Sequence, residues 1–151
     1  MREIALIRAP WRDPVEVAAA GAELDHAIAF LSDGSPGRGR WSYVLAEPAA
    51  VLTVAPGDPR DPFDAMRRLL GPEAPTSPDG PPFQGGLAGL LTYELGARLE
   101  AVGHRSHPDW PLLACGLYDA VLAFDHQDRA PLAWKISPAA MRSTMSATAA
   151  S

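Results

Sequence analysis

The fold of this chain is best approached from residues 83–100, which read Phe-Gln-Gly-Gly-Leu-Ala-Gly-Leu-Leu-Thr-Tyr-Glu-Leu-Gly-Ala-Arg-Leu-Glu. The first part, residues 85–93, is largely apolar, contains three glycines and carries no charge. A strand of that composition suits a place where a second backbone approaches closely, because glycine has no side chain to hold it off. Residues 94–100 have the composition of a short helix. The stretch therefore predicts a closely packed strand followed by a short helix.

Further strands are predicted on both sides of this stretch. Residues 41–45 place two aromatic side chains and a leucine on one face and Ser42 and Val44 on the other, which is the period of a strand. Isoleucine, valine and aromatic residues favour the same structure elsewhere. The other predicted strands are Ile4–Ile7, Ile28–Leu31, Ala50–Val54, Gly116–Phe124 and Pro131–Ile136, the last two joined as a hairpin by a turn at 125–128.

Two predicted helices begin with the same pair of residues, at Asp13–Pro14 and at Asp61–Pro62. The aspartate can accept hydrogen bonds from the free amides of the first turn, where proline is also well tolerated. We expect the first helix to continue past Gly21 to about Leu24, although glycine weakens a helix. The second helix is predicted over residues 62–70, with its apolar side chains on one face.

The order of these elements indicates an α+β protein with antiparallel sheets and outer helices. Its strands come in runs between helices, whereas a doubly wound sheet alternates strand and helix throughout. Five prolines in residues 72–82 predict a stiff surface connector. Residues 137–151 contain little besides Ala, Ser, Thr and Met and show no apolar period, so they predict a disordered tail. The 151 residues fit one domain, expected over residues 1–136.

Composition excludes several classes of protein. Apolar residues make up 47% and charged residues 21%, as in ordinary globular proteins. The net charge is −5 and the basic residues are scattered, so we expect no nucleic-acid partner. No apolar run approaches the roughly 18 residues that cross a membrane, and the amino terminus lacks the apolar core of a secretion signal. The sequence thus predicts a soluble, cytoplasmic protein.

The glycine-rich run Gly85–Gly89 is not predicted to bind phosphate. It has neither the Gly-x-Gly-x-x-Gly spacing of dinucleotide sites nor the Gly-Lys-Ser/Thr of a P-loop, and no lysine precedes Lys135. Close packing of backbones is the better interpretation. No serine lies in a Gly-x-Ser-x-Gly elbow, so a hydrolase triad is rejected.

The remaining reactive side chains form no catalytic set either. His104 and His107 lie three apart in a loop, but a zinc site needs three or four ligands. The lone Cys115 excludes an internal disulfide, and its apolar surroundings predict a buried, inert thiol. Tyr93 and Tyr118 each precede a carboxylate, and we expect partly buried rings whose hydroxyls reach a polar neighbour. No metal and no catalytic residue is predicted in this chain.

Three segments together resemble a known family, aminodeoxychorismate synthase component I. They are Phe83–Glu100, then Cys115–Gln127 with its Gly-Leu-Tyr-Asp and Asp-His-Gln motifs, and Gly39–Pro48 with its Gly-Arg-Trp-Ser-Tyr motif. Their order and spacing match, and the resemblance covers about residues 3–136. Anthranilate synthase component I is similar in outline.

The resemblance implies a fold and an activity. In that family the whole chain forms one α+β body with two packed antiparallel sheets, of which residues 1–136 would be the amino-terminal half. The carboxy-terminal half, which is missing from this sequence, would hold chorismate, Mg²⁺ and the catalytic groups. A glutamine amidotransferase would supply ammonia, and the product, 4-amino-4-deoxychorismate, leads to 4-aminobenzoate and folate. We therefore expect no independent activity, and self-association or dependence on a partner chain.

One site can be carried over by resemblance. Similar proteins hold a tryptophan molecule, as inhibitor or structural ligand, against a Leu-x-Ser-Gly turn and the start of the next strand. Here Leu31–Gly34 takes the place of the turn, with Asp33 where the family usually has serine. The expected ligand residues are Asp33, Arg38, Gly39, Arg40 and Trp41. Two alternatives stay open: an anthranilate synthase amino-terminal domain, and a stand-alone module that binds tryptophan or docks to an amidotransferase.

Overall fold

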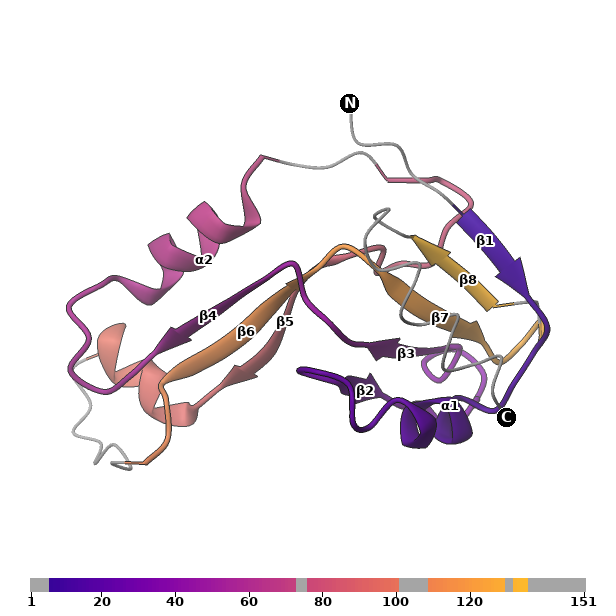
Figure 1. The fold of residues 1–151 in the computed structure, drawn as a ribbon, viewed down its shortest axis with the longest axis horizontal. Coiled ribbons are helices and arrows are strands. Elements are labelled where there is room, and N and C mark those ends of the chain that lie inside the picture. Colours follow the sequence, from indigo (N-terminus) through magenta and orange to yellow (C-terminus); the bar gives the residue numbers. More distant parts are fainter. Residues whose placement is uncertain (1–5, 73–75, 101–108, 130–131, 136–151) are drawn as a thin grey trace. The chain divides into compact units, whose positions relative to one another are not determined.

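The chain folds into helices and two sheets in the computed structural model, which describes residues 6–72, 76–100, 109–129 and 132–135 (Figure 1). Two compact units share the chain. The first comprises Met1–Pro48, Ala74–Gly86 and Tyr118–Ser151, and the second comprises Ala49–Glu73 and Leu87–Leu117. Every strand pair with a defined register is antiparallel, so the predicted α+β class with antiparallel sheets is confirmed.

The first unit contains a five-stranded sheet with the order β1-β8-β7-β3-β2. Its central strands pair so that Trp41 lies opposite Asp125 and Val44 opposite Leu122. The predicted hairpin at the end of the chain is confirmed, because β7 pairs with β8. The strand bounds are β1 Leu6–Ala9, β2 Ile28–Phe30, β3 Trp41–Leu45, β7 Val121–Asp125 and β8 Leu132–Lys135.

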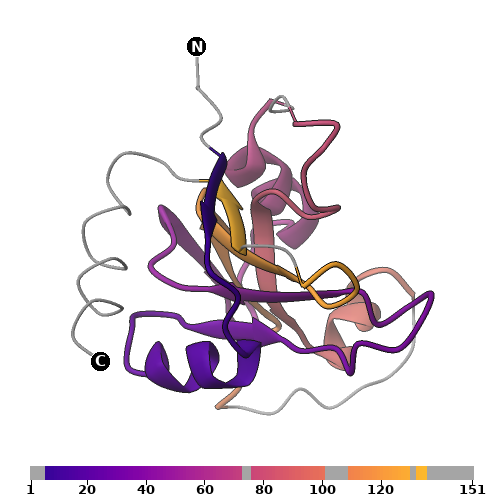
Figure 2. The same cartoon turned by 90° about the vertical axis from the view of Figure 1, so that its right-hand side faces the viewer.

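Helix α1, Pro14–Ala20, begins where the sequence predicts, because Asp13 Oδ1 accepts the Val15 amide hydrogen at 2.7 Å. Its Val17 and Ala18 pack on the sheet face that carries Val44 and Phe124 (Figures 1 and 2). The prediction that α1 continues past Gly21 is wrong. Glycine has a low helix propensity, and Gly21 caps the helix instead, with turns after it.

The second unit contains a three-stranded sheet with the order β4-β6-β5. Helix α2, Pro62–Leu70, packs Phe63, Met66 and Leu69 against its buried face, which is the predicted amphipathic pattern. Cys115 lies in this core at 3% exposure, and burial raises the pKa of its thiol, so the predicted buried thiol is confirmed. The other elements are β4 Ala50–Val54, β5 Gly86–Leu91, β6 Leu113–Tyr118 and the 3₁₀ helix η1 Tyr93–Arg98.

The close approach predicted for the glycine-rich strand is confirmed at Gly89. A Cβ atom built there would lie 2.6 Å from Cys115 Cα and would also collide with the Ala114 carbonyl oxygen. Atoms in ordinary contact keep about 3.5–4.0 Å. The neighbouring strand therefore requires glycine at this position, and the run packs backbone against backbone.

The single strand predicted over Gly116–Phe124 is wrong, because the structure divides it into β6 and β7. Strand β6 ends at Tyr118 and β7 begins at Val121. The two pieces have different partners: Leu117 pairs with Ala50, whereas Leu122 pairs with Val44. The break at 119–120 thus lets the chain pass from one sheet to the other.

Among the residues that the structure describes, none of the helices has the length and the apolar character needed to cross a membrane.

Candidate functional site

The loop between β2 and β3, residues 31–40, contains four of the five predicted ligand residues. Asp33 is exposed, and its Oδ1 accepts the Ser35 amide hydrogen at 2.9 Å. The hydroxyl and the amide of Ser35 hold the pKa of Asp33 below its usual value. Gly39 is buried against this turn, and a Cβ built there would lie 2.7 Å from Ser35 Oγ. Asp33 and Gly39 thus form one tight turn around Ser35.

Arg40, the fourth predicted ligand residue, is joined to the turn after β7. Its Nε lies 3.1 and 3.0 Å from the two carboxylate oxygens of Asp125, and its Nη2 lies 2.6 Å from Oδ2. The same Nη2 donates to Asp128 at 3.0 Å. Burial raises the pKa of Asp125, but hydrogen bonds from Arg40 and from the amides of Asp128 and Gln127 outweigh it and hold the pKa below its usual value. Arg40 is therefore already occupied with a structural ion pair.

Trp41 begins a row of aromatic rings on one side of β3. Its ring stacks on Tyr43 with centroids 6.4 Å apart, and the Arg40 guanidinium lies 5.3 Å from the Trp41 centroid. Tyr43 meets Phe83 edge to face at 5.8 Å, and its hydroxyl accepts the Phe83 amide hydrogen at 3.3 Å. Sequence reasoning missed Tyr43 and Phe83 as site residues. The alternation of β3 could have found Tyr43, since it shares a face with Trp41.

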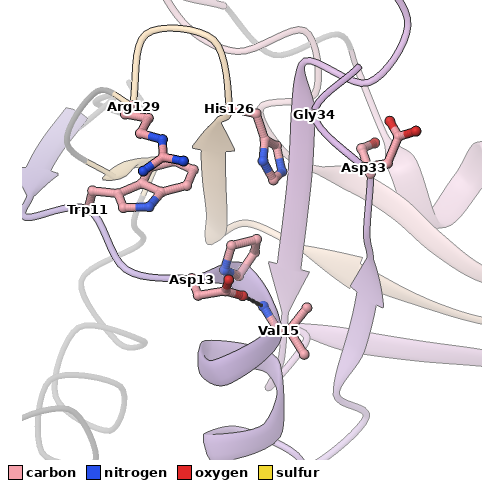
Figure 3. Close-up of a pocket in the computed structure, with 9 residues that line it drawn as sticks. Trp11, Asp13, Val15, Asp33, Gly34, His126 and Arg129 are labelled. Carbon is pink, nitrogen blue, oxygen red and sulfur yellow. Dashed lines mark hydrogen bonds between the residues drawn. The ribbon is translucent and has the colours of Figure 1, made fainter.

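A cavity of about 440 Å³ adjoins the loop in the first unit (Figure 3). Among the five predicted residues, Asp33 lines it and the other four do not. Arg38 lies exposed in the turn before Gly39. The structure thus gathers Arg40 and Trp41 at the aromatic row and Asp33 at the cavity. Further residues around the cavity are Trp11, Asp13, Ser32, His126 and Arg129.

A chain of hydrogen bonds links the loop to β3 and to the turn after β7. The Ser32 amide donates to Ser42 Oγ at 2.9 Å, and the Ser32 hydroxyl donates to the Trp41 carbonyl at 2.8 Å. Ser42 Oγ lies 2.7 Å from His126 Nε2, and Ser42 is fully buried. The His126 amide donates to the Arg40 carbonyl at 2.8 Å. The sequence signal for the Ser42–His126 contact is weak, because the two residues are 84 positions apart.

The other candidates from the sequence are placed as follows. His104 and His107 lie outside the described residues. No group of three His, Cys, Asp or Glu side chains that could hold a metal occurs in the described ranges. The hydroxyl of Tyr118 donates to the His26 carbonyl at 2.7 Å, which is the predicted polar contact, but the ring is fully rather than partly buried. Tyr93, expected to be partly buried, is 80% exposed at the start of η1.

Known proteins match parts of this chain. No family model matches it. Aminodeoxychorismate synthase component 1 of Escherichia coli K12 is 35% identical over 104 residues, which cover 58% of this chain and 23% of that protein. The protein of the same name from Klebsiella aerogenes is 30% identical over 144 residues, covering 83% of this chain and 32% of the relative. The protein of the same name from Salmonella typhimurium LT2 is 38% identical over 81 residues, which cover 52% of this chain and 18% of that protein. This chain therefore matches about a third or less of each relative's length.

Proposed function

We propose that residues 1–136 are the amino-terminal part of an aminodeoxychorismate synthase component 1. The observation that carries the proposal is the match to three proteins of that name, which reaches 83% of this chain but at most 32% of a relative. The antiparallel sheets and outer helices are consistent with the fold that the resemblance implies. The proposed function is a part in converting chorismate to 4-amino-4-deoxychorismate, towards 4-aminobenzoate and folate.

Exposed apolar side chains in the second unit support the view that this part acts with further protein. Strands β4 and β5 are the outer strands of their sheet and carry no charged residue, whereas natural edge strands are commonly protected by charges. Leu91 is 47% and Leu99 69% exposed, and Trp110 is 56% exposed. We propose that a chorismate-binding half, with its Mg²⁺, covers such surface and contributes the catalytic groups. On this proposal the chain alone self-associates in light scattering, and a monodisperse monomer would contradict it.

An assay with the missing half tests the proposed activity. The chain is incubated with chorismate, ammonia and Mg²⁺, alone and together with the carboxy-terminal two thirds of the Escherichia coli relative. We expect product from the mixture and none from either part alone. Aminodeoxychorismate made by this chain alone would refute the proposed division of roles. Anthranilate as the product of the mixture would instead favour the anthranilate synthase alternative. Replacing ammonia by glutamine and an amidotransferase tests that proposed partner.

We further propose a tryptophan-type pocket formed by Asp33, Arg38, Gly39, Arg40 and Trp41. The aromatic row at β3 supports it, because an indole ring can stack on rings that are already held in place. The ion pair of Arg40 with Asp125 fixes the guanidinium over Trp41 before any ligand arrives. A ligand here would stack on the aromatic row at Trp41, while Asp33 lies at the neighbouring cavity.

Calorimetric titration with tryptophan tests this pocket and the stand-alone binding module at once. Micromolar binding by the chain alone favours the module, whereas binding only in the mixture with the carboxy-terminal half favours the enzyme part. We expect Trp41→Ala to abolish binding and Trp110→Ala, which removes an exposed tryptophan of the second unit, to leave it unchanged. Equal binding by both variants would refute the assigned residues.

A further inference from the structure

His126 lies where the two ends of the 31–40 loop meet. Its ring reaches the buried Ser42 just after the loop, with Nε2 2.7 Å from Oγ, and its main-chain amide donates to the Arg40 carbonyl at 2.8 Å. The ring also lies against Gly34, because a Cβ built at Gly34 would be 3.4 Å from His126 Nδ1. The Trp11 ring meets the imidazole edge to face at 5.6 Å (Figure 3). The side chain is thus enclosed on three sides.

The hydrogen bonds of Ser42 determine which ring nitrogen carries the hydrogen. A serine hydroxyl has one hydrogen to donate and two lone pairs to accept with. One lone pair takes the Ser32 amide hydrogen at 2.9 Å. Since Ser42 is 0% exposed, bulk solvent does not reach its hydroxyl hydrogen, which needs a partner inside the protein. In the part of the chain that the structure describes, His126 Nε2 lies 2.7 Å from Ser42 Oγ and can accept this hydroxyl hydrogen.

We propose that His126 is a positioning residue that holds the 31–40 loop and does so as its Nδ1–H tautomer. In a neutral imidazole one nitrogen donates and the other accepts, so an accepting Nε2 places the hydrogen on Nδ1. If Nε2 carried the hydrogen, Ser42 Oγ would face two donors and its own hydrogen would be buried without an acceptor. A buried donor left without a partner is costly. Ser42 therefore favours the Nδ1–H tautomer of His126. In that tautomer His126 accepts the Ser42 hydroxyl hydrogen and holds Ser42 where it can accept the Ser32 amide hydrogen.

The loop held in this way carries the residues of the proposed pocket. Ser32 is tied to both Ser42 and the Trp41 carbonyl, so it joins the start of the loop to its end. Loss of the His126 contact frees Ser42 to turn and releases the Ser32 amide. Asp33 and Gly34, which follow directly, then lose their anchor. The loop inference stands on these contacts alone, while its effect on tryptophan binding rests on the proposed function.

Two substitutions of His126 separate the tautomer from simple packing. His126→Gln keeps an acceptor near the Nε2 position, because the glutamine amide oxygen reaches equally far. His126→Asn carries its oxygen near the Nδ1 position and leaves Ser42 without an acceptor. Both variants remove the ring, so packing against Trp11 and Gly34 is lost alike. We expect hydrogen exchange at the Ser32 amide to be about tenfold faster in His126→Asn and within about threefold of wild type in His126→Gln.

Nitrogen-15 NMR of the unaltered protein at pH 8 gives an independent readout that does not depend on a variant's folding. We expect Nε2 to be unprotonated and Nδ1 protonated, and Ser42→Ala to produce a mixture of both tautomers. A hydrogen on Nε2 in the wild-type protein, or equal exchange at Ser32 in the Gln and Asn variants, would overturn the proposal. A wild-type chain that binds no tryptophan would refute the proposed pocket, while the tautomer and exchange results would still decide the role of His126.

Discussion

The substitution Gly89→Ala adds one methyl group where β5 and β6 approach each other closely. The new Cβ would lie 2.6 Å from Cys115 Cα, about 1 Å inside normal contact distance, and would also strike the Ala114 carbonyl. Both obstacles are backbone, so no side-chain rotation can relieve the overlap, and the two strands must separate. Overpacking of this kind costs about 1–3 kcal/mol, and hydrogen bonds that the separation weakens are worth about 1 kcal/mol each. Burial of the methyl returns at most about 0.8 kcal/mol.

We therefore expect Gly89→Ala to lower the free energy of unfolding by about 3 kcal/mol. Gly96→Ala is the matched control, because the same methyl at Gly96, in η1, meets no atom within 4 Å. The control should be neutral or stabilising by up to about 1 kcal/mol, since alanine restricts the unfolded chain. Urea unfolding followed by circular dichroism measures both. At an m-value of roughly 2 kcal/mol/M, the midpoint of Gly89→Ala should fall by about 1.5 M. Midpoints of the two variants within about 0.3 M of each other would refute the close approach of β5 and β6.

Three further predictions concern the ion pair, a helix cap and the thiol. Asp125→Asn should destabilise the chain at pH 7. Because the folded-state pKa of Asp125 is lowered from 3.8, the difference in unfolding free energy from wild type should persist above pH 4 and vanish as the pH falls through that folded-state pKa. A difference that stays constant down to pH 2 in urea titrations would contradict this. Asp61→Ala removes the cap on the Asp64 amide and should cost about 1 kcal/mol, measured in the same way, while Asp61→Asn should cost less. Cys115 should react with a thiol reagent slowly in buffer and rapidly in urea, since it is 3% exposed; equal rates would place it at the surface.

Local chemistry explains why most of the elements could be predicted from the sequence. The Asp-Pro pairs place both helix starts correctly, because each aspartate accepts an amide hydrogen two or three residues further along the chain. The bounds of β3 and β4 agree with the prediction residue for residue, since three of the five residues in each are β-branched or aromatic. These signals act over a few residues, and a sequence shows them directly.

The incorrect prediction of one strand over 116–124 arises because distant partners decide where the strand ends. Residues 116–124 have strand composition throughout, yet the chain breaks at 119–120 because β4 pairs with the first part and β3 with the second. Composition describes a residue's preference for a strand but not the sheet in which that strand pairs. The end of α1 at Ala20 is decided locally by contrast, because the low helix propensity of Gly21 outweighs the favourable residues on either side of it.

The candidate site was less predictable than the fold for the same reason. The resemblance implies Asp33 and Arg40 as ligand residues, but neither it nor the sequence reveals the partners that fix them in place. Arg40 is held by Asp125, 85 residues away in the sequence, and Ser42 by His126, 84 residues away. The first two residues of the Asp-His-Gln motif at 125–127 bind Arg40 at the end of the 31–40 loop. His126 also contacts Ser42, which in turn accepts the amide hydrogen of Ser32 at the start of the loop. The motif therefore supports the loop, and substitutions in it should loosen the residues of the proposed tryptophan pocket without belonging to that pocket.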